Sequence, residues 1–115
     1  MLGISISDVT EAISLVSEID GFLGMQKYEI ARHKIVNLKD KLIQFKSSAE
    51  FNVIVHENRI KEIVELLSTH INTLYNVVFG EIEDIKFDSG ELNAQLQEIA
   101  NYLTDFKNKI KYQIG

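Results

Sequence analysis

The sequence predicts an all-α fold, either an antiparallel helical bundle or a long helical hairpin, of three to four helices. Apolar residues recur at steps of three and four along most of the chain, which aligns them on one face of a helix. None of the 115 residues is proline, the residue that most often interrupts helices. Only residues 51–55 have a strand-like composition, and no comparable partner strand exists. The length suits a single domain over residues 1–115.

The first helix is predicted at about 8–22 and the second at about 26–46. Asp8 and Glu11 have the spacing of a capping box, with Asp in the cap position. Gly21 and Gly24 favour a break or bend within residues 21–26, and one continuous helix over 8–46 is the alternative. The two apolar stripes are Val9, Ala12, Val16, Ile19 and Leu23, then Tyr28, Ala31, Ile35, Leu38, Leu42 and Phe45.

The third helix is predicted at about 49–85, with Ser47 and Glu50 as its capping box and residues 51–55 in its first turns. Gly80 marks either close packing or an early end. A loop signal at residues 87–91 precedes a fourth helix at about 89–113. The stripes of these helices are Ile60, Val64, Leu67, Ile71, Leu74, Val78 and Ile85, then Leu92, Leu96, Ile99, Leu103, Phe106 and Ile110.

Charge alternates in blocks along the chain. Residues 1–26 carry a balance of −4, residues 27–46 carry +4, residues 47–105 carry −8 and the tail carries +3, which together give the net charge of −5. Such blocks favour antiparallel neighbours of opposite sign, within the chain or between chains. Solvated helix faces are the alternative interpretation.

No residue cluster predicts an enzyme, a cofactor site or a metal site. The dipeptide His56-Glu57 begins like a zincin motif, but Ile60 stands where the second histidine ligand belongs. His56 and His70 would be about 21 Å apart along one helix, too far to share a metal. The acidic residues near the end of the third helix suit a solvated corner, and glycine-rich phosphate loops and serine-nucleophile elbows are absent from the sequence.

Surplus apolar residues lead to the main functional hypothesis. Tyr75, Phe79, Ile82 and Phe87 exceed what one packing seam requires, and such a surplus often marks an interface. We therefore expect a non-enzymatic protein-protein interaction module, which would act as an adaptor, inhibitor or assembly subunit. Its partner would be another protein, a second copy in a homo-oligomer, or both.

The basic segment 27–46 carries the second set of candidate interface residues. Lys27, Lys34 and Lys41 are spaced by seven residues and therefore align along one flank of a helix. That flank could lie on phosphates, as in a nucleic-acid-associated regulator. The net charge of −5 favours pairing with the acidic flank of a neighbouring helix, so nucleic acid is the less favoured partner.

A further alternative comes from a family resemblance. In its length, proline-free helices, Ser-rich turn near the middle and acidic balance, the chain resembles the small helical-hairpin partners of type VII secretion systems, the WXG100-like superfamily. That resemblance implies an elongated partner or chaperone of a secreted effector. The chain contains no Trp, so the W-x-G turn is missing, and its own turn reads Lys46-Ser47-Ser48-Ala49-Glu50-Phe51. No residue roles are transferred from the family.

The sequence predicts a cytoplasmic protein without a membrane span. Its apolar runs are shorter than the roughly 18–20 residues that a bilayer requires. The first basic residue is Lys27, so the N-terminus lacks the charged start of a signal peptide. Secretion by a route without such a signal remains open.

Overall fold

The computed structural model describes residues 4–80 and 89–114, which form α-helices and connecting turns without any strand. The all-α prediction is therefore confirmed. The helices in this part of the chain number five, against the three to four expected. They are α1 (Ile6–Gly24), α2 (Tyr28–Phe45), α3 (Ala49–Ile54), α4 (Glu57–Val78) and α5 (Gly90–Ile114).

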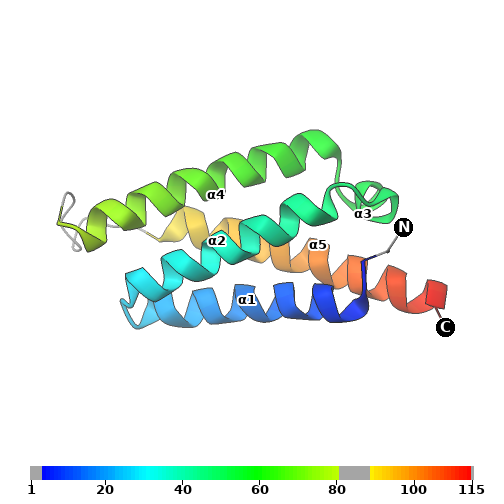
Figure 1. The fold of residues 1–115 in the computed structure, drawn as a ribbon, viewed down its shortest axis with the longest axis horizontal. Coiled ribbons are helices and arrows are strands. Elements are labelled where there is room, and N and C mark those ends of the chain that lie inside the picture. The colour runs from blue at the N-terminus through cyan, green and yellow to red at the C-terminus, as the bar shows by residue number, and fades with distance from the viewer. Residues whose placement is uncertain (1–3, 81–88, 115) are drawn as a thin grey trace.

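The four long helices form an antiparallel bundle with short α3 at one end (Figure 1). Helix α2 packs against α1 and α4, while α5 returns along α1 and packs loosely on α4. Each long helix therefore runs opposite to the preceding one, as in an up-and-down bundle. The radius of gyration of 14.7 Å is close to the roughly 13 Å expected for a compact chain of this length, so the hairpin alternative is not adopted.

Helix α1 begins earlier than predicted, because its capping box is formed by Ser5 and Asp8. The Ser5 hydroxyl accepts a hydrogen bond from the backbone N–H of Asp8 at 3.1 Å. The Asp8 carboxylate accepts one from the backbone N–H of Ser5 at 3.2 Å. The assignment of Asp8 as the cap with Glu11 as its partner is therefore wrong by three residues, since Ser5 and Asp8 have the same spacing one turn upstream.

The predicted break between the first two helices is confirmed, and the single continuous helix over 8–46 is wrong. Helix α1 ends at Gly24, and Gln26 has a positive φ of 59°, which a regular helix cannot include. The N–H of Lys27 donates to the carbonyl of Phe22 at 2.9 Å, which satisfies the end of α1 and reverses the chain.

The single helix predicted over 49–85 is wrong, because the chain is extended at Val55 and His56 between α3 and α4. Val53, Ile54 and Val55 are β-branched and disfavour helix, and the side chain of Val55 is buried. Helix α3 is capped by Ser48, one residue after the predicted cap, and the Ser48 hydroxyl accepts from the N–H of Phe51.

Gly80 marks an early end of its helix. Helix α4 stops at Val78, and Gly80 has a φ of +79°, a conformation that glycine adopts without steric cost. The N–H of Phe79 donates to the carbonyl of Tyr75, and that of Gly80 donates to the carbonyl of Val77. The predicted continuation over 81–85 lies outside the described residues. The last helix, predicted at about 89–113, is α5, which begins at Gly90 and ends at Ile114.

The predicted stripes form the core of the bundle. Every stripe residue of α1 and α5 is buried, and so are Ala31 to Phe45 of the stripe on α2. At the α3 end, the rings of Phe45, Phe51 and Phe106 meet with centroids 4.9–5.9 Å apart. Such contacts add to the free energy gained from burying the rings. The core therefore joins α2, α3 and α5. Phe51 is the buried residue of α3, and it anchors this short helix to the bundle.

The acidic and basic charge blocks pair within the chain. Lys34 of α2 lies 3.1 Å from Glu18 of α1, and Lys41 lies 3.1 Å from Glu11 and 3.6 Å from Asp8. The prediction of antiparallel neighbours with opposite charge is confirmed for the first two blocks. These pairs are partly exposed, so each contributes little to stability while together they favour this register of α1 on α2.

Candidate interaction site

The end of α4 exposes an apolar cluster that we call the aromatic tip, formed by Tyr75, Val78 and Phe79. Their exposed fractions are 47%, 37% and 59%. The rings of Tyr75 and Phe79 lie one helical turn apart with centroids 4.4 Å from each other. Leu74 and Val77 of the same turns are buried, so the cluster lies on the side of α4 that faces away from the core.

Helix α2 supports the aromatic tip through Arg32. The Arg32 guanidinium lies 5.4 Å from the centre of the Tyr75 ring, within the range of a cation–π interaction. Glu29 holds this guanidinium, since its carboxylate accepts from Arg32 Nη2 at 2.7 Å and also contacts His33 Nε2 at 2.8 Å. The hydrogen bond from Arg32 lowers the pKa of Glu29. Glu29, Arg32 and Tyr75 thus form a chain of contacts that orients the Tyr75 ring.

The predicted interface residues fall into three groups. Tyr75 and Phe79 come together at the aromatic tip. Val78, a residue of the predicted core stripe, is exposed beside them, so its predicted burial is wrong. Ile82 and Phe87 lie outside the described residues. Lys34 and Lys41 face α1 and are engaged in ion pairs, whereas Lys27 is exposed at the start of α2. Lys34 and Lys41 are therefore directed to α1 and not to the aromatic tip.

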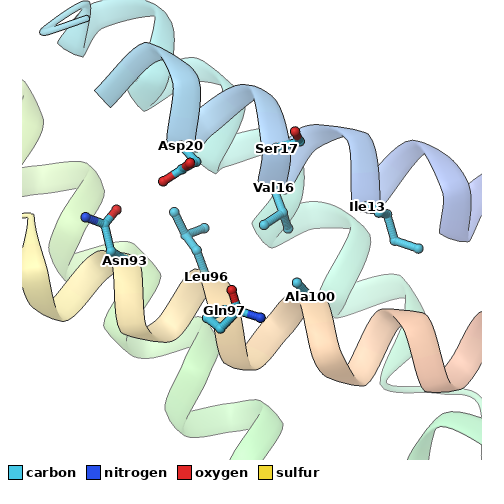
Figure 2. Close-up of a pocket in the computed structure, with 8 residues that line it drawn as sticks. All are labelled: Ile13, Val16, Ser17, Asp20, Asn93, Leu96, Gln97 and Ala100. Carbon is cyan, nitrogen blue, oxygen red and sulfur yellow. The ribbon is translucent and has the colours of Figure 1, made fainter. Parts of the chain in front are cut away.

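A shallow groove of about 280 Å³ follows the seam between α1 and α5, on the opposite edge of the bundle from the aromatic tip. Figure 2 shows Asp20 and Asn93 at one end of this groove and Ile13 and Ala100 at the other. Val16 and Leu96, both nearly buried, lie between them. The groove thus has an apolar floor and a polar rim, and the sequence did not predict it.

Polar side chains bridge α4 and α5 where the two helices pack loosely. Arg59 donates two hydrogen bonds to the Glu98 carboxylate, at 2.6 and 2.8 Å, and the Tyr102 hydroxyl donates to the same group at 2.7 Å. The hydrogen bonds from Arg59 lower the pKa of Glu98, and the bond to Glu98 raises the pKa of Tyr102. Arg59 and Glu98 are 39 residues apart, so no local pattern predicts their contact.

The histidines have structural partners and lie apart from one another in the chain. His33 contacts Glu29, and His56 caps α4 by accepting from the N–H of Asn58 at its Nδ1. His70 Nε2 is hydrogen-bonded to the side-chain oxygen of the buried residue Gln95 at 2.7 Å. Within residues 4–80 and 89–114, no group of three or more His, Asp or Glu side chains is arranged to hold a metal ion.

Comparison with known proteins leaves these surfaces as the basis for any functional inference. No protein-family model, curated protein or solved structure matches the chain. Among the helices that the structure describes, none has the length and apolar character needed to cross a membrane.

Proposed function

We propose that the chain is a non-enzymatic protein-interaction module and that the aromatic tip is its binding surface. The observation that carries this proposal is the exposed pair Tyr75 and Phe79, whose rings contact each other outside the hydrophobic core. Tyr and Arg are among the residues that most often dominate binding energy at protein interfaces, and Arg32 adjoins Tyr75. The partner would offer an apolar pocket or groove into which the last turn of α4 inserts.

The contacts around Tyr75 support such binding because they reduce its entropic cost. A side chain that is already ordered before binding loses less conformational freedom in the complex. Glu29 and Arg32 hold the Tyr75 ring from α2, and the i, i+4 contact with Phe79 holds it within α4.

We also propose the cytoplasm as the compartment in which the module acts.

The two alternative functions have less support from the described residues. A nucleic-acid-binding flank would need free cations, but Lys34 and Lys41 are paired with carboxylates of α1. A WXG100-like secretion partner would need a long two-helix hairpin, whereas this chain packs four long helices within 48 × 25 × 23 Å. Neither alternative accounts for the exposed aromatic pair.

Site-specific photo-cross-linking in the native cells tests the proposal. A photoreactive phenylalanine analogue at position 79 should form a defined adduct with one protein. The same analogue at position 53 is the matched control, because Val53 is 74% exposed but lies on α3 at the other end of the bundle. An adduct from position 79 that is absent from position 53 supports the proposal.

Two variants complete this test. Tyr75→Ser should abolish formation of the adduct at position 79 while leaving the circular dichroism spectrum unchanged, because the Tyr75 side chain is half exposed. Phe79→Ser should likewise reduce partner binding without loss of helix content. Equal adducts from positions 53 and 79, or none from either, would contradict the assignment of the aromatic tip as the binding surface.

A further inference from the structure

The face that surrounds the groove between α1 and α5 is almost free of charge. About one residue in four of the chain is charged. However, α1 and α5 each border the groove with a row of four exposed residues, and none of these residues is charged. Each row includes a residue that lines the groove, Ser17 on α1 or Gln97 on α5. Depletion of charged residues is a compositional signal of protein interfaces. The rows are Thr10, Ser14, Ser17 and Gly21 on α1, and Ala94, Gln97, Asn101 and Thr104 on α5.

Two opposite charges stand at the two ends of this face. Asp20 lies at the end of the groove beside Asn93 (Figure 2). Lys107 lies two helical turns beyond Ala100 on α5, and therefore on the same flank past the other end. Neither side chain forms an ion pair with the described residues. The 14 residues from Asn93 to Lys107 span about 21 Å, so Asp20 and Lys107 cannot meet within one molecule.

We propose that a second copy of the chain covers this face and forms a two-fold symmetric, antiparallel dimer. A two-fold axis that crosses the seam at the level of Ile13 and Ala100 lies midway between the two charged ends. This axis sets Asp20 of one protomer opposite Lys107 of the other and generates the pair twice. The face is thus complementary in charge to the same face of a second, rotated protomer. This complementarity favours a second copy of the chain as the partner that covers the face.

The size of the face predicts a weak dimer. The 19 residues of α1 extend about 28 Å, and two neighbouring helices are about 20 Å wide, so the face covers roughly 560 Å² on each protomer. The total of about 1,100 Å² is near the lower limit for a specific interface. Interfaces of this size are typical of weak, transient complexes, so the dimer should dissociate on dilution.

Two glycines of α1 are compatible with such an approach. A Cβ atom at Gly21 or Gly24 would meet no atom within 4 Å, and neither residue has a positive φ. Packing and backbone conformation within the protomer therefore do not require glycine at either position. Their lack of side chains would allow the backbone of a second protomer to come close to the end of α1 near Asp20.

Sedimentation equilibrium of the full chain tests the proposal, over protein concentrations from about 1 µM to about 500 µM. The wild type should change from monomer to dimer across this range. Ser17→Arg places a long cation on the rim of the groove and should weaken the dimer at least about tenfold. Asn72→Arg is the matched control, because Asn72 is exposed on α4 away from the groove and its replacement should have no effect.

A charge exchange tests the geometry of the dimer. Asp20→Lys and Lys107→Asp should each weaken dimerisation about tenfold, because each places like charges opposite one another. The double variant should restore the wild-type constant, since it exchanges the charges of both pairs. A monomeric wild type at every concentration, or a double variant no tighter than the single ones, would overturn the proposal.

Two further measurements separate loss of the dimer from loss of folding and from loss of binding at the aromatic tip. If circular dichroism shows that Ser17→Arg loses helix, Gln97→Arg provides the same test from α5. Phe79→Ser should leave the dimer constant unchanged even if it abolishes binding of another protein. A dimer that Phe79→Ser abolishes and Ser17→Arg leaves intact would overturn the assignment of the α1–α5 face.

Discussion

His56 caps α4 with an uncommon group, a ring nitrogen, where Asn, Asp or Ser usually serves. Its Nδ1 accepts the hydrogen bond from the N–H of Asn58, and the residue has the extended backbone of a cap. His56→Ala removes this acceptor and should lower the free energy of unfolding by about 1 kcal/mol. His56→Asn retains an acceptor and should match or exceed the wild type. Urea denaturation measures both, and equal stability of the two variants would contradict the capping role.

Glu98 links stability to pH through its contact with Arg59. Because hydrogen bonding to Arg59 lowers the pKa of Glu98 in the folded state, its stabilising contribution is full above the ordinary glutamate pKa of about 4.3. The contribution is lost as the pH falls below that value towards the folded-state pKa. Asp8, Glu29 and Glu50 also have lowered pKa values and act in the same direction.

Glu98→Gln therefore should flatten the pH dependence of stability between about pH 5 and pH 2 without abolishing it. Near neutral pH, the variant should also be less stable than the wild type by about 1 kcal/mol, because Arg59 loses its charged hydrogen bonds to Glu98 and keeps only its contact with Glu62 at 3.3 Å. Urea denaturation at a series of pH values measures both effects. An unchanged pH slope would show that Glu98 is not ion-paired in solution.

At the scale of the helices, replacing Gly21 or Gly80 by alanine should change the stability in opposite directions. Gly21 lies inside α1 with space for a methyl group, so Gly21→Ala should stabilise the monomer by about 0.5–1 kcal/mol. Gly80 has a φ of +79°, so Gly80→Ala should destabilise it by about 1 kcal/mol. Thermal denaturation at low protein concentration compares the two variants. If both were stabilised, or both destabilised, the placement of Gly21 inside α1 and of Gly80 beyond the end of α4 would be contradicted.

The short helix α3 depends on one aromatic side chain. Phe51 is 1% exposed and contacts Phe45 and Phe106, so Phe51→Ala should cost about 3–5 kcal/mol through lost burial and a residual cavity. Val53→Ala is the control on the same helix, because Val53 is mostly exposed and should cost less than about 0.5 kcal/mol. Similar losses for the two variants would indicate that α3 does not dock on α5.

The sequence predicted the helix interiors better than their ends. Burial follows the three-four spacing directly, so the stripe of α5 was identified residue by residue. Caps were ambiguous because Ser5, Asp8 and Glu11 are successive three-residue steps, and Ser47 and Ser48 are adjacent. The break at Val55 depends on the burial of its side chain by distant helices, a tertiary effect that local spacing does not contain.

At the scale of the whole molecule, the charge blocks predicted the pairing of α1 with α2, but not the position of α4 relative to α5. The contacts of Arg59 with Glu98 and of His70 with Gln95 join residues 39 and 25 positions apart. Two of the three residues of the aromatic tip, Tyr75 and Phe79, were identified as apolar surplus from the sequence, whereas Val78 was placed in the core stripe. Their support by Arg32 and the groove along α1 and α5 required the packed bundle.

This bundle buries one set of aromatic rings and exposes another. Nuclear magnetic resonance with a soluble paramagnetic probe tests this arrangement directly, since the probe broadens signals of rings that solvent reaches. The ring signals of Tyr75 and Phe79 should broaden strongly, while those of Phe45, Phe51 and Phe106 should be unaffected. Comparable broadening of all five rings, or protection of Tyr75 and Phe79 in the isolated monomer, would contradict the account.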